Sequence, residues 1–242
     1  MIARWAALAA AAVLLCSCEL IRAVEEPTDL YTVTPKSTFM SGMPTVLWQL
    51  AVETPAASAN LNTGRIAIAQ TPTSSDYYAK TAWTDRAPLM VQTRIVDSFE
   101  NSHKIVAVAR DSFALRANYV LQPDLRNFEA MYFYGGTPIV HVRIVAKMVR
   151  LPDRQIIGVA TFERCVRARA DKIPKVVAAF DQALGSVMKR LVDWTLRAAP
   201  PKPPSESAPY DIAKFRDPAN ALLDSENCPK GNDTSNVPLT DE

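Results

Sequence analysis

The feature that most constrains the fold is a pair of long alternating segments followed directly by a long amphipathic one. Residues 139–150 and 155–170 alternate apolar and polar side chains, and residues 151–155 form a short polar connection between them. Alternation with a period of two over this length is typical of strands that bury one face. The two segments therefore predict an antiparallel β-hairpin. In its first strand the predicted buried face carries Val140, Val142, Ile144, Ala146 and Met148.

The segment that follows the hairpin has helical periodicity. Between residues 173 and 197, apolar side chains recur at intervals of three and four, which aligns them in one stripe along a helix. The stripe consists of Val177, Phe180, Leu184, Val187, Leu191 and Trp194. Asp171 stands where an N-cap is expected. A shorter amphipathic helix is predicted over residues 88–102, where Pro88 suits the first helical turn.

Shorter apolar segments complete the predicted sheet. They are residues 46–53, 64–70, 104–109 and 117–130, the last with a bend expected near Pro123. Together with the hairpin, these make about six strands. Two amphipathic helices and a sheet of this size predict an α+β fold, in which a mostly antiparallel or mixed sheet is covered on one face by both helices.

An aromatic group lies just before the hairpin, in MYFYGG at residues 131–136. Tyr132, Phe133 and Tyr134 are a large apolar group for a loop between strands. Aromatic residues are enriched at interface hot spots, so one interpretation is contact with a partner or a membrane. The other is an exposed loop or strand end. Trp83 immediately precedes the first predicted helix, and we expect it in the core.

The N-terminus has the organisation of a secretory signal. Arg4 precedes an apolar run over residues 5–15, which is shorter than the roughly 20 residues that span a bilayer but suits a signal peptide. The next residues resemble a bacterial lipobox, with Leu15 at −3 and Ser17 at −1 relative to Cys18. We predict that residues 1–17 are removed and that Cys18 carries acyl chains, which hold the protein on a membrane. An ordinary signal peptide and an uncleaved anchor are the alternatives.

The other two cysteines of the mature chain, Cys165 and Cys228, form an even pair. In an oxidising compartment they can form a disulfide, but the sequence leaves their separation open. The chain contains only two histidines, His103 and His141. No metal site is predicted, because a zinc site needs several nitrogen and sulfur ligands close together.

Composition sets the domain boundaries and excludes several classes of protein. Residues 18–29 are predicted to be a lipidated linker and residues 30–198 the folded domain. Residues 199–242 hold 8 of the 18 prolines and are predicted to be a largely disordered tail. A formal charge of +2 gives no case for nucleic acid as a partner.

The sequence gives no case for an enzyme either. It has neither a glycine-rich phosphate loop nor a G-x-S-x-G nucleophile motif, so we predict no catalytic residue and no cofactor. The basic cluster Arg164, Arg167, Arg169, Lys172 and Lys175 is open to two interpretations. It is either a contact for anionic lipid or an acidic partner, or a solvated strand end.

The order of motifs resembles the ABC-type transport auxiliary lipoprotein family over about residues 15–198. The similarity begins with the lipobox and ends with the alternating hairpin and the closing helix. Between them come DLYTV (29–33), VETP (52–55), RIAI (65–68), YY (77–78), Trp83 five residues before Pro88, and YVLQPDLRNFE (119–129).

The resemblance implies a non-enzymatic periplasmic subunit that works with MCE-domain proteins and their ABC transporter in phospholipid transport. It would dock the transport conduit to the outer membrane, to which its acyl chains anchor it. Inner-membrane retention is an alternative, because Glu19 is chemically close to the aspartate that signals it. Self-association is left open. The alternative function is a lipoprotein assembly or stability factor of another envelope complex, such as a secretion or pilus apparatus.

Overall fold

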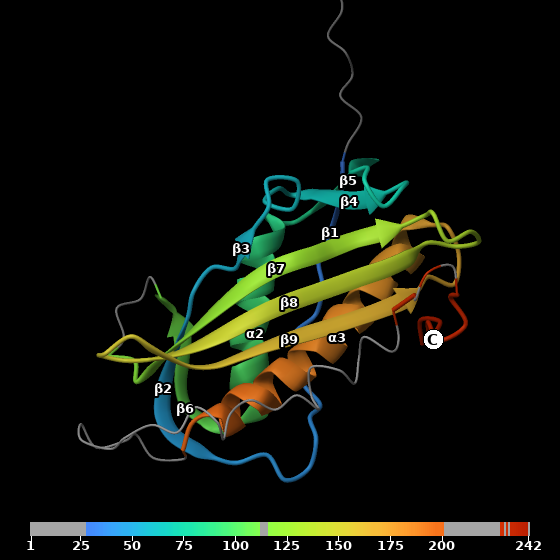
Figure 1. Ribbon diagram of the computed structural model, residues 1–242. Coiled ribbons are helices and arrows are strands. Elements are labelled where there is room, and N and C mark those ends of the chain that lie inside the picture. The colour runs from blue at the N-terminus through green and yellow to red at the C-terminus, as the bar shows by residue number, and fades with distance from the viewer. Residues whose placement is uncertain (1–27, 112–115, 201–227, 230, 232, 242) are drawn as a thin grey trace, which may run out of the picture.

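A computed structural model describes residues 28–111, 116–200, 228, 229, 231 and 233–241. Cys18 and the signal peptide predicted for residues 1–17 lie outside these residues. The described chain forms a nine-stranded mixed sheet with two helices on one face (Figure 1). The α+β class and the two covering helices are confirmed. The number of strands is nine rather than six.

The predicted segments all form the expected elements. The strands among them are β2 (Val46–Val52), β4 (Arg65–Ala69), β6 (Ile105–Arg110), β7 (Tyr119–Met131), β8 (Ile139–Arg150) and β9 (Gln155–Arg167), and the helices are α2 (Ala87–Ser102) and α3 (Ile173–Ala198). The additional strands are β1 (Asp29–Tyr31), β3 (Ala56–Ala57) and β5 (Asp76–Trp83). β1 and β3 are too short to show a periodicity. In β5 most side chains are partly or fully exposed, so its sequence lacks the alternation of a half-buried strand.

β7 is the axis of the sheet. On one side it pairs antiparallel with β8, which pairs antiparallel with β9. On the other side it pairs parallel with β2 through residues 119–121, with β3 through 124–125 and with β4 through 129–131. β6 extends the sheet beyond β2, and β5 and β1 extend it beyond β4. At about 3.3 Å per residue, these two groups of strands lie roughly 30 Å apart along β7.

The irregularity of β7 is not where the proline predicts it. Pro123 pairs in register with Ala146, whereas the register shifts between Leu125 and Asn127. Arg126 is therefore the extra residue of a β-bulge.

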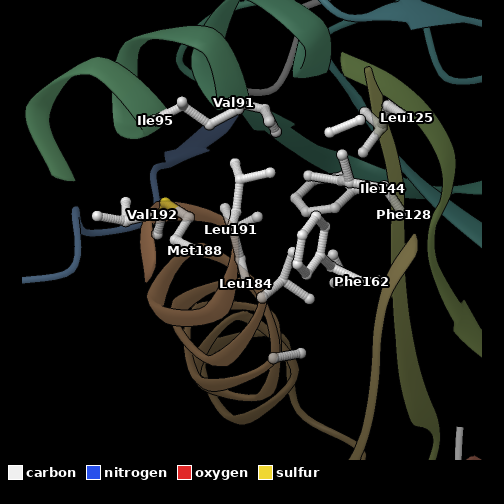
Figure 2. Close-up of a cluster of buried hydrophobic side chains, with 14 of the residues drawn as sticks. Val91, Ile95, Leu125, Phe128, Ile144, Phe162, Leu184, Met188, Leu191 and Val192 are labelled. Carbon is white, nitrogen blue, oxygen red and sulfur yellow. The ribbon is translucent and has the colours of Figure 1, made fainter. Parts of the chain in front are cut away.

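The core lies between the sheet and the two helices. The predicted buried face of β8 is completely buried, as are Phe128 and Phe162 on the neighbouring strands. Figure 2 shows these rings pointing toward Leu184 and Leu191 of α3, with Val91 of α2 above them. Burying each such side chain contributes about 1.5–3 kcal/mol. Of the predicted stripe on α3, only Val177 is not fully buried.

The start of α3 differs from the prediction. Its N-cap is Lys172, and no side chain caps the helix through a hydrogen bond. Asp171 instead accepts a hydrogen bond from Tyr132. Trp83 is 3% exposed and belongs to the core, as predicted. Among the described residues, no helix has the length and apolar character needed to cross a membrane.

Candidate functional site

Residues singled out in three separate parts of the sequence meet where β7 ends and β8 begins. A small apolar cluster, separate from the main core, forms there and is called the terminal cluster below. Its buried members are Met131, Ile139, Cys165 and Val237, and Ala69, Phe133, Tyr134 and Cys228 pack against them. The structure thus brings Cys165 and Cys228 together with Phe133 and Tyr134, two of the three predicted aromatic residues.

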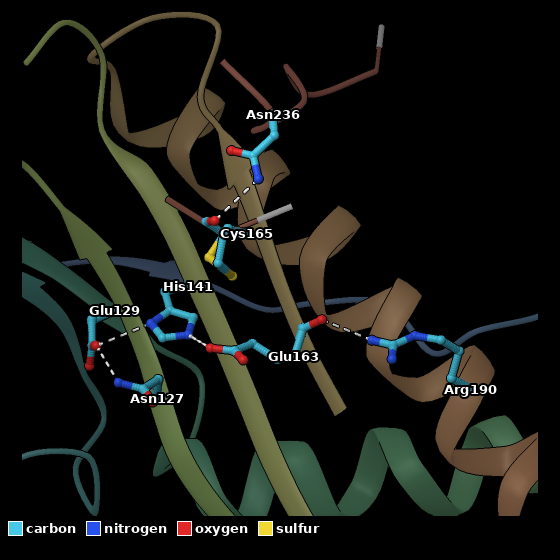
Figure 3. The surroundings of a disulfide bond; sticks show 8 residues. Asn127, Glu129, His141, Glu163, Cys165, Arg190 and Asn236 are labelled. Atoms are coloured by element: carbon cyan, nitrogen blue, oxygen red, sulfur yellow. Dashed lines mark hydrogen bonds and ion pairs between the residues drawn. A yellow bond between two sulfur atoms is a disulfide. The ribbon is translucent and has the colours of Figure 1, made fainter. Parts of the chain in front are cut away.

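A disulfide joins Cys165 of β9 to Cys228, 63 residues later in the chain, with a Cα–Cα distance of 4.8 Å. Cys165 is fully buried, and Cys228 is half-buried. Figure 3 shows the bond beside the β8 and β9 strands. The disulfide attaches the C-terminal segment, residues 228–241 as far as they are described, to the end of β9.

Backbone hydrogen bonds continue this attachment. The Arg167 amide donates to Pro238 O over 2.8 Å, and the Thr240 amide donates to Arg167 O over 3.0 Å. These bonds form a parallel bridge between Arg167 and Leu239. The Gln182 side chain of α3 exchanges two hydrogen bonds with Asp241, of 3.0 and 2.9 Å. The C-terminal segment therefore lies along the outer edge of β9 and pairs with it through this one bridge.

The aromatic turn, Tyr132–Tyr134, is half-buried. The rings of Phe133 and Tyr134 lie 4.4 Å apart between centroids and pack on the terminal cluster. Tyr132 packs against the main core. Much of the apolar surface of the turn is therefore covered within the chain, and contact with a partner stays a prediction.

Tyr132 connects three elements through its hydroxyl group. This hydroxyl lies 2.6 Å from Asp171 Oδ1 and 2.7 Å from the hydroxyl of Tyr78 in β5. Because an ionised carboxylate only accepts, Tyr132 donates to Asp171 and Tyr78 donates to Tyr132. Burial, followed by the bond to Asp171, raises the pKa of Tyr132 from 10.0 to about 12. Burial also raises the pKa of Tyr78 far above its ordinary value. No sequence signal links these three residues.

Arginines of the basic cluster make hydrogen bonds within the chain. Arg167 Nη1 donates to Gly135 O over 3.0 Å and to Thr137 O over 2.8 Å, which closes the loop after the aromatic turn. Arg169 Nε donates to Thr240 O over 2.6 Å and holds the C-terminal segment. Arg164 lines a polar pocket of about 340 Å³ between α3 and the chain after β1. Two of these arginines therefore have structural contacts.

A polar network lies beside the disulfide. His141 Nε2 is 2.6 Å from Glu163 Oε1, and His141 Nδ1 is 3.9 Å from Glu129 Oε1. The hydrogen bond to His141 is the main cause that lowers the pKa of Glu163 below its ordinary value. Figure 3 shows the His141 ring between the two carboxylates. The other histidine, His103, is the C-cap of α2 in the left-handed conformation, with φ of 52°.

The fold and the disulfide-attached C-terminal segment define a small α+β domain with two helices on one face of a mixed sheet. Residues 29–192 match the model of a family described as the ABC-type transport auxiliary lipoprotein component. The chain belongs to this family, as the order of its motifs predicted. The match ends before the C-terminal segment.

Two solved structures and one sequence relative are similar to this chain. The crystal structure of protein XCC0632 from Xanthomonas campestris, of family DUF330, has a TM-score of 0.67 and 33% identity, covering 71% of this chain and 96% of that one. A second crystal structure, with a TM-score of 0.56 and 14% identity, covers 69% and 97% of the two chains and shows the fold alone. Protein bll6063 of Bradyrhizobium diazoefficiens is 34% identical over 154 residues, which are 62% of this chain and 40% of that relative.

Proposed function

We propose that the protein is a periplasmic, non-enzymatic adaptor of an MCE-type ABC lipid-transport system, anchored to the outer membrane by acyl chains on Cys18. The observation that carries the proposal is the match of residues 29–192 to an auxiliary lipoprotein component of ABC-type transport. This match begins eleven residues after the predicted lipid-bearing cysteine. An auxiliary component supports a role in binding and positioning rather than in catalysis.

The path of the chain gives the proposal an orientation. The predicted linker of residues 18–29 spans at most about 40 Å when fully extended, so the domain stays near the membrane. This linker leads into β1, which pairs with β5. Figure 1 shows β1 at the end of the sheet that carries β4 and β5. We call this group of strands the anchor end.

The opposite end of β7 carries the surface that we assign to the partner. Here β2 pairs with β7, and the start of β9 pairs with the end of β8. Leu47, Ile156 and Val159 lie at this far end and are 56%, 45% and 50% exposed. Exposed apolar groups that gather in one region favour contact with another protein. An MCE-domain protein would bind at this far end, roughly 30 Å from the anchor end.

The division into two ends suits an adaptor in lipid transport. A phospholipid that crosses the periplasm needs an apolar path, because exposing its acyl chains to water is unfavourable by about 25 cal/mol per Å². The conduit that provides this path must be held against its target membrane. A domain with an acylated anchor end and an apolar far end does this without chemistry.

The test is a pull-down from detergent-solubilised envelopes, with the bound proteins identified by mass spectrometry. We expect an MCE-domain protein to be recovered with the wild-type chain and to be lost with the double variant Leu47→Glu/Val159→Glu. Leu239→Glu is the matched control, since Leu239 is 55% exposed but lies beside β9 at the other end. Recovery of secretion or pilus components in place of an MCE-domain protein would favour the alternative function.

The anchor has a separate test. Cys18→Ser should leave the protein unacylated and shift it from the outer-membrane fraction to the soluble periplasmic fraction. A Cys18→Ser protein that still fractionates with membranes and matures normally rules out the acyl anchor. Fractionation of the wild-type chain with the inner membrane rules out the outer-membrane assignment.

A further inference from the structure

Three strands place one row of reactive side chains on the face of the sheet opposite the helices. His141 of β8 pairs with Glu129 of β7 and with Cys165 of β9. Directly paired side chains in antiparallel strands lie about 4.5–5.5 Å apart at Cβ. Val140 and Val142, the neighbours of His141 in β8, point toward the helices, so the row faces the other way. Figure 3 shows Glu129, His141 and Cys165 on this face.

The C-terminal segment brings a fourth group to this row. Cys228 lies outside the named strands and reaches the row through its bond to Cys165. One nitrogen of His141 and the sulfurs of Cys165 and Cys228 all lie within 4.8 Å of one another. The His141 side chain is only 14% exposed, and Cys165 is fully buried.

We propose that Cys165, Cys228 and His141 form a redox-gated site for a thiophilic divalent cation such as Zn²⁺. The reduced protein binds the cation, and the disulfide form excludes it. A dithiol or phosphine reductant supplies two electrons, and two protons from water convert the disulfide into two thiols. Binding of Zn²⁺ releases these two protons, because cysteine sulfur ligates zinc as the thiolate. Reoxidation by a small-molecule disulfide, which accepts the two electrons and takes up two protons to become two thiols, converts both thiolates back into the Cys165–Cys228 disulfide and expels the cation.

The geometry requires only small movements. Zinc lies about 2.3 Å from thiolate sulfur and about 2.0 Å from imidazole nitrogen in tetrahedral sites, so its ligand atoms are about 3.5–4 Å apart. The nitrogen and sulfur atoms already lie within 4.8 Å of one another. The two sulfurs must separate once their bond is broken. Cys228 can supply this movement without disturbing the pairing of β8 with β9, because it belongs to neither strand.

The surroundings of His141 complete the site. A metal-ligating histidine usually donates its second ring N–H to a carboxylate, which fixes the orientation of the ring. His141 has a carboxylate beside each nitrogen, Glu163 at 2.6 Å and Glu129 at 3.9 Å. One carboxylate can orient the ring while the other serves as the fourth ligand. Asn127 Nδ2 donates to Glu129 Oε1 over 2.8 Å and positions that carboxylate.

Cobalt spectroscopy tests the proposal, because Co²⁺ substitutes for Zn²⁺ and reports thiolate ligation by its absorption. The purified full chain is reduced with a phosphine, separated from the reductant without oxygen and titrated with Co²⁺. We expect one equivalent to bind, with thiolate-to-cobalt charge-transfer bands and visible bands of a tetrahedral site, and Zn²⁺ to abolish both. The oxidised chain should show none of these bands.

Three variants make the result specific to this site. His141→Ala should weaken the affinity of the reduced protein by more than the roughly 10–100-fold that loss of an outer-shell partner costs, and Cys228→Ser should remove most of the charge-transfer intensity. His103→Ala is the matched control and should bind as the wild type does. Absence of thiolate bands in the reduced wild type overturns the proposal, and so does unchanged affinity in His141→Ala.

Circular dichroism of the same samples shows whether the reduced chain is folded. A reduced chain that keeps its fold, or that regains it on addition of Zn²⁺, supports the site. A reduced chain that is unfolded and stays unfolded with Zn²⁺ present overturns it.

Discussion

The hydroxyl of Tyr132 donates to Asp171 Oδ1 over 2.6 Å, and so ties the turn after β7 to the residue before the N-cap of α3. Tyr78 of β5 donates to the same hydroxyl over 2.7 Å. These three hydrogen-bonded side chains therefore link the anchor end of the sheet, the aromatic turn and the start of the longest helix. The bond from Tyr132 takes Asp171 away from the capping role that its position in the sequence suggests.

Tyr132→Phe removes both hydrogen bonds and leaves the ring in place. We expect the free energy of unfolding to fall by about 1–2 kcal/mol. The hydrogen bond to the charged Asp171 raises this value, and the partial exposure of the bond to solvent lowers it. Urea denaturation measures this change. Tyr134→Phe is the matched control, since it removes a hydroxyl from the same turn without removing either of these two hydrogen bonds. It should change stability by less than about 0.5 kcal/mol. Equal effects of the two variants would show that the hydrogen bonds contribute nothing.

The same tyrosine predicts how stability changes at alkaline pH. The pKa of Tyr132 is raised from 10.0 to about 12 in the folded chain, so between these values the unfolded chain loses a proton that the folded chain keeps. Stability is fully present below pH 10 and is lost as the pH rises toward 12. Tyr132→Phe should make this decline shallower in urea titrations from pH 9 to 12. The decline of Asp171→Asn should be intermediate between those of the wild type and Tyr132→Phe, because this variant removes the carboxylate but leaves Tyr132 buried.

Glu163→Gln tests the network around His141 at acidic pH. The lowered pKa of Glu163 has the hydrogen bond to His141 as its main cause. The contribution of Glu163 to stability is therefore present above pH 4.5, the pKa of the carboxyl in the unfolded chain. It is lost as the pH falls through the lower pKa of the folded chain. The variant should be about 1 kcal/mol less stable at pH 6 and should lose less stability between pH 5 and pH 3. Glu100→Gln, on the exposed side of α2, should follow the wild-type profile at both ends of this range.

Cys228→Ser should release the C-terminal segment from β9 while the domain stays folded, because the family match ends at residue 192. Hydrogen exchange should speed up by about tenfold or more at the Arg167 amide, which donates to Pro238 O, and stay unchanged in the centre of β8. The effect on global stability has a ceiling of about 4 kcal/mol for a loop of this length. Retained protection at Arg167 would show that backbone pairing holds the segment without the disulfide.

Two glycines should respond in opposite directions to replacement by alanine. A Cβ on Gly158 would lie 3.0 Å from Trp194 Cζ2, and this ring is 5% exposed. Gly158→Ala should therefore destabilise the fold by about 1–3 kcal/mol through overpacking. At Gly185, inside α3, the nearest atom is Lys36 Cδ at 3.8 Å, so Gly185→Ala should stabilise the fold by about 0.5–1 kcal/mol. Thermal unfolding of both variants checks the two signs, and a shared sign would contradict the packing argument.

Local periodicity carried most of the fold prediction. The stripe on α3 and the alternation in β8 and β9 are repeats within single segments, so they identified α3 and the hairpin. β5 was missed because most of its side chains are exposed in some measure, and pairing on both edges rather than an apolar pattern holds it in the sheet. The bulge at Arg126 was missed because a proline three residues earlier is the stronger local signal.

The candidate site was predicted as separate residues. Cys165, Cys228 and the aromatic turn each stand out by residue type, and Cys18 stands out by the spacing of its lipobox. Their convergence could not be predicted, because 63 residues separate the two cysteines and the path of the intervening chain depends on contacts across the whole fold. Nothing in the local sequence of Tyr78 or Asp171 indicates that Tyr132 lies between them.

The sequence by itself determined six of the nine strands and both helices, the family, and the residue types available for a membrane anchor and a disulfide. Only the tertiary structure decided that β2, β3 and β4 pair in parallel along one edge of β7. It also decided that the C-terminal segment lies beside the end of β9, and that His141 lies between two carboxylates beside the disulfide. The physical reason is the separation in sequence over which each feature is decided. Secondary structure follows from side chains within a few positions of one another, whereas strand partners and polar clusters depend on which distant surfaces are buried together.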